Sequence, residues 1–160
     1  MYVVQLNKAS KNTVRTFLIV WFGQLISLFG SALTSFALGI WVYKNTGSVT
    51  QFALISFFAI LPALVVSPIA GALVDRWNRR DAMILSDCVA GLSTFGIALL
   101  FLAGQLQIWH IYLATIISSI SHAFQWPAYR ATTTLLVPKK HLGRASAMTQ
   151  FSEALAQLFS

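Results

Sequence analysis

The chain reads Gly71-Ala72-Leu73-Val74-Asp75-Arg76-Trp77-Asn78-Arg79-Arg80 across residues 71–80. This segment carries one acidic and three basic side chains, and it lies between two long apolar runs. A glycine allows two helices to approach closely, and a cluster of Asp and Arg residues can hold helix ends at an aqueous surface. We interpret the segment as a tight turn at the surface of a membrane.

The composition of the chain supports a membrane protein. Of its 160 residues, 57% are hydrophobic and only 9% are charged, and the mean hydropathy is +0.72. No Asp, Glu, Lys or Arg occurs in residues 16–43, 45–74 or 88–129. Because roughly 20 apolar residues cross the hydrocarbon core of a bilayer, the sequence predicts four complete spans and part of a fifth.

We therefore expect an all-α integral membrane protein in which residues 16–160 form a partial transmembrane bundle after an N-terminal tail of residues 1–15. The expected spans cover residues 17–43, 51–74, 82–102, 108–128 and 144–160, and the last is incomplete.

The ends and bends of these spans follow from local signals. Pro62 and Pro68 are expected to kink the second span, Asp81 to cap the third, and residues 130–143 to connect the fourth to the fifth. From Arg144 the fifth extends only about 24 Å, which indicates the N-terminal piece of a longer protein or the product of a truncated gene.

The positions of the basic residues predict the orientation. The formal net charge is +7, but with a cytoplasmic N-terminus ten of the 11 Lys and Arg residues fall inside, and only Lys44 falls outside. This split follows the positive-inside rule. It predicts a multi-pass protein of the cell (inner or plasma) membrane with a cytoplasmic N-terminal tail, and it argues against a nucleic-acid partner.

Three of the expected spans carry polar residues at helical spacing. These are Gln24, Ser27, Ser31 and Ser35 in the first; Thr115, Ser118, Ser119, His122 and Gln125 in the fourth; and Ser146, Gln150, Glu153, Gln157 and Ser160 in the fifth. Steps of three, four and seven residues place each set on one helix face. One reading is packing between helices. Three such faces together favour a shared water-filled cavity.

Glu153 is the most informative single residue, because it lies about 13 Å into the fifth span. A carboxylate at that depth has to pair, take up a proton or face water. It is a candidate for proton coupling, and the alternative is a structural Glu paired with a further helix.

Asp87 and His122 have two readings each. Asp87 is a second candidate for proton coupling, or it has a structural role in the first turns of its helix, near Arg79 or Arg80. His122 can titrate near neutral pH, or it is a core histidine with its hydrogen bonds satisfied. The sequence contains no metal-ligand cluster, catalytic constellation or phosphate loop, so we expect no enzyme, no cofactor and no metal.

The turn after the second span resembles the G-x-L-x-D-R-x-G-R-R/K signature of the major facilitator superfamily. Six residues stand at matching positions: Gly71, Leu73, Asp75, Arg76, Arg79 and Arg80. Further stretches resemble the drug-efflux branch of that family, which includes macrolide and siderophore exporters. They are Thr46-Gly47-Ser48, Leu61-Pro62, Pro68 and Gln125-Trp126-Pro127-Ala128.

The resemblance implies a fold of twelve helices in two bundles, with substrate crossing between them by alternating access. It also implies that Asp75, Arg76, Arg79 and Arg80 lock the cytoplasmic side in the outward-open state. Asn78 replaces a turn glycine of the signature. Asparagine is acceptable at this position because it enters the left-handed region readily. Gln125 and Trp126 stand where many relatives carry a carboxylate.

These observations predict a secondary active transporter that exports a small amphipathic compound (a drug, macrolide or siderophore-like molecule) by proton antiport. Its expected partners are the lipid bilayer, the substrate, protons and the missing C-terminal helices of the same transporter. The alternative is a truncated, transport-inactive membrane fragment, or a subunit that depends on a partner.

Overall fold

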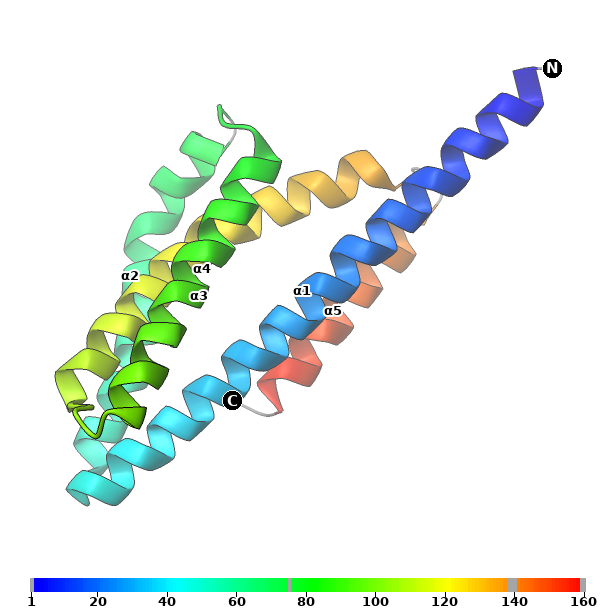
Figure 1. The fold of residues 1–160 in the computed structure, drawn as a ribbon. Coiled ribbons are helices and arrows are strands. Elements are labelled where there is room, and N and C mark those ends of the chain that lie inside the picture. The colour runs from blue at the N-terminus through cyan, green and yellow to red at the C-terminus, as the bar shows by residue number, and fades with distance from the viewer. Residues whose placement is uncertain (1, 75, 138–140, 159–160) are drawn as a thin grey trace. The chain divides into compact units, whose positions relative to one another are not determined.

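The structure is a computed structural model that describes residues 2–74, 76–137 and 141–158, with side chains described from residue 15 onward. The described residues form five α-helices and their connections: α1 (Tyr2–Thr46), α2 (Val49–Val74), α3 (Arg79–Leu102), α4 (Ile108–Leu136) and α5 (Leu142–Gln157) (Figure 1). The helices form two compact units. One contains residues 1–33 and 130–160, and the other contains residues 34–129.

The unit of residues 34–129 is organised around α4, which lies beside α2 and α3 (Figure 1). One apolar cluster joins Val42 of α1, Ile55 of α2 and Ile111 of α4, and a second joins Val74, Ala82 and Ala128. The small side chains of α4, such as Ala114 and Ser119, are buried. Small residues allow membrane helices to approach closely, so α4 can contact several neighbours at once.

The other unit pairs the N-terminal part of α1 with α5 (Figure 1). Phe17, Val137 and Ala145 form its apolar cluster, with Trp21 and Met148 packed against them. The Trp21 indole Nε1–H donates a hydrogen bond to the Met148 carbonyl at 3.1 Å. Buried indole N–H groups require such a partner, so this bond fixes the position of α5 along α1.

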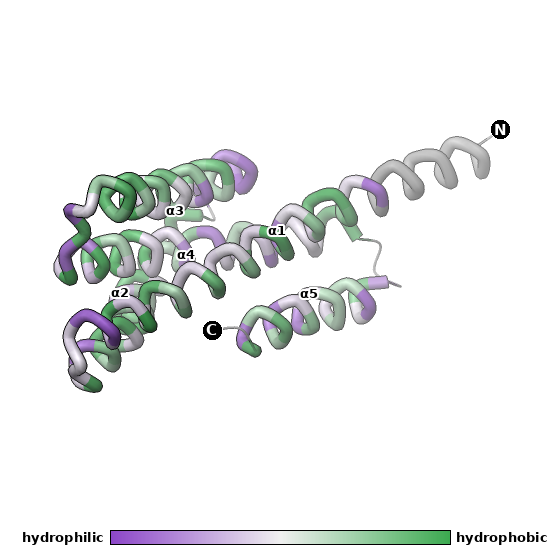
Figure 2. The backbone as a smooth tube through the Cα atoms, turned by 60° about the horizontal axis from the view of Figure 1, so that its bottom comes forward, coloured by the Kyte–Doolittle hydropathy of each residue, from purple (hydrophilic) through white to green (hydrophobic). Residues whose placement is uncertain are grey.

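Three of the described helical segments are long and apolar enough to cross a membrane: Arg15–Thr46, Val49–Val74 and Arg79–Leu102. Figure 2 shows hydrophobic residues along these segments and hydrophilic ones near their ends. Of the four complete spans that the sequence predicts, three therefore have the length and apolarity to cross a membrane. The described part of α5 has only 16 residues, and α4 carries the Ser, Thr, His and Gln side chains that lower its hydropathy.

The end of α4 differs from the sequence expectation. The helix continues through Pro127 to Leu136, so much of the expected connector after residue 128 is helical. Proline removes one backbone donor, but continuing the helix carries the chain into the Phe17 cluster, where Val137 is buried. The apolar contact offsets the lost hydrogen bond.

The start of α3 also differs from expectation. Asn78, rather than Asp81, is the N-cap, and its side chain accepts a hydrogen bond from the Arg80 N–H at 3.1 Å. Asn is among the residues that cap helices best. The sequence suggested that Asn78 would adopt a left-handed backbone conformation, because it replaces a glycine of the signature. The φ of Asn78 is −66°, which lies outside that region. Among the described residues, only Gly47 and Gly104 have positive φ, at 63° and 67°.

Ser119 of α4 inserts its hydroxyl into the backbone of α2 beside Pro62. The hydroxyl donates to the Ala59 carbonyl at 2.7 Å and accepts from the Ala63 N–H at 3.1 Å. These two groups stand at i and i+4, so they would otherwise be partners in the helical ladder. A side chain in the ladder next to a proline is a recognised cause of helix bending. Ser119 thus satisfies the backbone near Pro62 and ties α2 to α4.

We expect Ser119→Ala to lower the free energy of unfolding by about 1 kcal/mol, because two backbone groups lose their partner where no bulk water replaces it. Unfolding in mixed detergent micelles, followed by circular dichroism, measures this change. The control is Ser118→Ala, because the adjacent Ser118 makes no hydrogen bond to the described residues and should have little effect. Equal losses in both variants would contradict the bridging role.

Candidate functional site

The charged turn links α2 to α3 and has a defined backbone on both sides of Asp75, which itself lies outside the described residues. The N–H groups of Arg76 and Trp77 donate to the Leu73 carbonyl at 3.0 and 3.1 Å. Arg76 and Arg80 are exposed, and Arg79 is half-buried. The turn therefore presents two exposed guanidinium groups from neighbouring helix ends.

Gly71 packs against no neighbouring helix within the described structure, and a close helix approach at this glycine stays a prediction. A Cβ added to it would meet no described atom within 4 Å, so no neighbouring helix of the described structure requires a glycine there. The described glycine whose Cβ would meet a neighbour is Gly39 of α1, where it would lie 2.8 Å from the Phe52 ring of α2.

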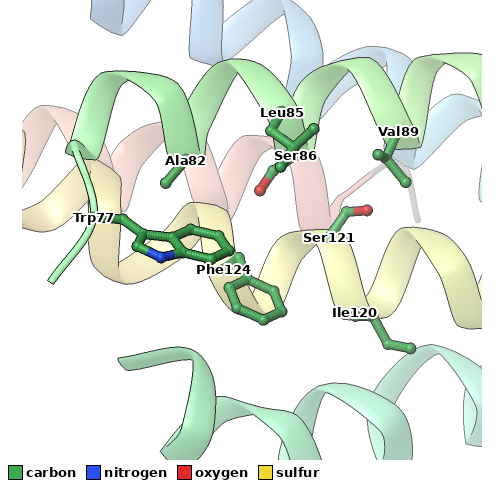
Figure 3. Close-up of a pocket in the computed structure, with 8 residues that line it drawn as sticks. All are labelled: Trp77, Ala82, Leu85, Ser86, Val89, Ile120, Ser121 and Phe124. Atoms are coloured by element: carbon green, nitrogen blue, oxygen red, sulfur yellow. The ribbon is translucent and has the colours of Figure 1, made fainter. Parts of the chain in front are cut away.

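A pocket of ≈ 210 Å³ lies between α3 and α4, next to the charged turn (Figure 3). Trp77 closes one end of it and stacks against Phe124, with 6.3 Å between ring centroids and 16° between ring planes. The other lining residues are Ala82, Leu85, Ser86, Val89, Ile120 and Ser121. The Ser121 hydroxyl donates to its own helix at the Ile117 carbonyl. This side of the contact between α3 and α4 is therefore mainly apolar.

A polar cluster also joins these two helices. The Gln125 side-chain amide donates a hydrogen bond from Nε2 to Oδ1 of Asp87 at 2.5 Å. His122, one turn before Gln125 on α4, hydrogen-bonds to the Gln125 side chain and interacts electrostatically with Asp87. We call these three residues the Asp87 cluster. Gln125 is buried, whereas Asp87 and His122 are half-buried.

The Asp87 cluster changes the interpretation of its members. One reading of the sequence placed Asp87 near Arg79 or Arg80, and the structure shows that Asp87 accepts a hydrogen bond from Gln125 on α4. An amide on α4 therefore meets a carboxylate on the neighbouring helix α3. Sequence reasoning missed this pair. The sequence holds a signal for it, because Asp87 and Gln125 lie at similar depths in their expected spans, measured from the ends next to the charged turn.

The expected cavity residues divide between the two units. Gln24, Ser27 and Ser31 are half-buried in the unit that contains α5, and Ser118 and His122 are half-buried in the unit around α4. Each unit is defined by itself, so a shared cavity remains a prediction.

Glu153 is half-buried on α5 and forms no hydrogen bond or ion pair with the described residues. The buried face of α5 consists of Ala145, Ser152 and Ala156, one position away from the polar stripe. Gln150 and Gln157 of that stripe are exposed, and Ser160 lies outside the described residues. The stripe of α5 therefore points away from the face that packs within its own unit.

The helices, the three apolar segments and the charged turn define an α-helical multi-pass membrane protein. Residues 20–160 match the family model of the Major Facilitator Superfamily, and the chain belongs to this family. The family consists of transporters rather than enzymes, as the sequence predicted.

Curated relatives are named as efflux proteins. Macrolide efflux protein A of Streptococcus pyogenes is 31% identical over 144 residues, which cover 90% of this chain and 36% of the relative. Multidrug efflux pump Tap of Mycolicibacterium fortuitum is 27% identical, covering 74% of this chain and 29% of the relative. Enterobactin exporter EntS of Shigella flexneri is 24% identical, covering 97% and 38%. The chain thus spans between 29% and 38% of the length of these relatives. No solved structure matches it significantly.

Proposed function

We propose that this chain forms the N-terminal part of an exporter that moves a small amphipathic compound out of the cytoplasm by proton antiport. The observation that carries the proposal is the 31% identity to a macrolide efflux protein over 90% of the chain. Relatives named for multidrug and siderophore export support a broad class of amphipathic substrate.

The proposed mechanism is alternating access, in which the substrate site opens in turn to each side of the membrane. Its cavity is lined by Gln24, Ser27, Ser31, Ser118, His122, Gln150 and Gln157, and further helices of the same transporter complete it. The exposed stripe of α5 supports this assignment, because Gln150 and Gln157 are available to such helices or to water.

The proposed gate is the charged turn of Gly71, Asp75, Arg76, Arg79 and Arg80. We place it in the cytoplasm, together with the N-terminus, because that orientation leaves Lys44 as the only basic residue outside. The exposure of Arg76 and Arg80 supports a gating role, since both guanidinium groups can pair with a second bundle in one state and separate from it in the other.

Two carboxylates are proposed to carry protons. Glu153 has no described partner, and Asp87 lies within the contact between α3 and α4. An acidic side chain in a span is costly to keep charged, so each can alternate between a protonated and an ionised state as its surroundings change.

Efflux from intact cells tests the export itself. Cells are loaded with a radiolabelled macrolide, and its loss is followed in the wild type, after deletion of the gene, and after restoration at the native locus. We expect deletion to slow the loss of label and restoration to reverse it. Equal rates in all three strains, with the protein detected in the membrane, would contradict export of this substrate class.

A further inference from the structure

We propose that Asp87, Gln125 and His122 form one proton-binding unit, in which the Gln125 amide couples the carboxylate of α3 to the imidazole of α4. Its role in transport rests on the antiport proposed above, whereas the coupling between the two ionisable groups can be measured without transport.

The geometry of Gln125 supports this coupling. Its amide nitrogen donates to Oδ1 of Asp87, and the same side chain hydrogen-bonds to His122. An amide has a donor end and an acceptor end, so with Nε2 engaged by the carboxylate its oxygen can accept from a ring N–H of His122. Gln125 itself does not titrate. It acts as a positioning residue that keeps the two ionisable groups in fixed contact.

A proton bound by Asp87 or by His122 changes the electrostatic environment of the other group. Ionised Asp87 and protonated His122 together carry no net charge, and a proton gained or lost at either group changes the charge of the whole unit. An ion inside a membrane protein is costly to leave uncompensated. The protonation states of Asp87 and His122 therefore depend on each other, as those of closely interacting groups do.

The other ionisable groups near the Asp87 cluster lie on α3 and α4 themselves. α2 has no ionisable side chain among its residues, Val49–Val74, and residues 34–46 of α1 contribute only Tyr43 and Lys44, near the opposite end of the unit. On α3, Arg80 and Asp81 lie about two turns before Asp87, and the exposed Cys88 follows it. On α4, the buried Tyr129 and the exposed Arg130 lie about one turn after Gln125. Asp87 is the charged group that acts on His122.

The test is a titration of the chain in lipid nanodiscs, with histidine labelled by nitrogen-15 and the ring signals followed by NMR. His122→Gln assigns the His122 signals among those of the three histidines. We expect Asp87→Asn to move the pH midpoint of the His122 titration by about one unit, the size expected when an opposite charge nearby is removed. Gln125→Met, which keeps the length of the side chain but removes the amide, should move it as well.

Two controls separate this effect from a general disturbance of the helices. Ser121→Ala alters the pocket side of the same helix pair and should leave the His122 midpoint unchanged. The ring signals of His110, near the start of α4, should be the same in every variant. In the variant that combines Asp87→Asn with Gln125→Met, the shift should be smaller than the sum of the two single shifts, because the two changes interrupt one connection.

An unchanged His122 midpoint in Asp87→Asn would overturn the proposal. The Asp87→Asn variant tests the proposal even if Gln125→Met fails to fold, because asparagine keeps the shape of the carboxylate and can still accept a hydrogen bond from Gln125. A moved midpoint together with efflux that ignores a pH gradient would leave the proton-binding unit in place and refute the antiport. The failures of the two proposals are therefore distinguishable.

Discussion

Replacement of Asp75 by asparagine should lower the transport rate at least tenfold while leaving the protein inserted in the membrane. Asp75 adjoins Arg76 and lies within five residues of Arg79 and Arg80, so its carboxylate balances part of their positive charge at the gate. Allosteric coupling energies of about 1–3 kcal/mol correspond to about 5- to 150-fold changes in equilibrium. Loss of the charge should shift the balance between inward- and outward-open states. Transport in cells, normalised to protein in the membrane, measures the effect.

Asp81→Asn is the matched control, because Asp81 is an exposed carboxylate on the first turn of α3 and stands outside the signature.

Single cysteines at the exposed positions Thr134 and Gln105, in a Cys88→Ser background, report accessibility on the two faces of the membrane. With a cytoplasmic N-terminus, Gln105→Cys should react with an impermeant thiol reagent in intact cells and Thr134→Cys should not. Unchanged transport and unchanged accessibility in Asp75→Asn would count against the gate, and the opposite labelling pattern would refute the orientation.

Replacement of Glu153 by glutamine should abolish the dependence of transport on an imposed pH gradient and leave the protein folded. Glutamine keeps the shape and the hydrogen-bonding ends of the side chain but cannot exchange a proton. Glu153 makes no hydrogen bond or ion pair with the described residues, so its replacement by the similarly shaped glutamine breaks neither kind of interaction there. Uptake into vesicles at different pH gradients measures the dependence, and a thermal unfolding curve measures the fold.

The matched control is Gln157→Asn, which alters the same stripe of α5 without changing an ionisable group and should retain the response to pH. A structural Glu153, paired with a further helix, predicts a different outcome, in which Glu153→Gln expresses poorly or unfolds at a lower temperature. Stable protein with normal proton-coupled transport would exclude both roles for Glu153.

Much of the helical arrangement could be predicted from the sequence, because each long apolar run ends at charged residues or at a glycine turn. α2 ends at Val74, directly before the charged turn, and α3 ends at Leu102, before the turn at Gly104. The end of α4 could not be placed in this way. Pro127 is a strong stop signal, but the contact of Val137 with Phe17, 120 positions apart in the sequence, determines the path of the chain.

The sequence singles out candidate site residues but does not say which of them pair. Periodicity assigned Ser118, His122 and Gln125 to one face of α4, but it cannot say which helix meets that face. The bond from Gln125 to Asp87 joins residues 38 positions apart, and the bonds of Ser119 reach 56 and 60 positions back to α2. These contacts depend on how helices pack, which a single sequence does not specify.

Proton-driven uptake of a macrolide by inside-out membrane vesicles tests the central claim most directly. In such vesicles an exporter moves substrate inward, and an acidic interior supplies the protons that leave in exchange. A gradient of two pH units is worth about 2.7 kcal/mol per proton, which sustains up to about a hundredfold accumulation for one proton exchanged. We predict that the gradient raises uptake at least several-fold and that a protonophore abolishes the increase. Uptake that is the same with and without the gradient would contradict the account.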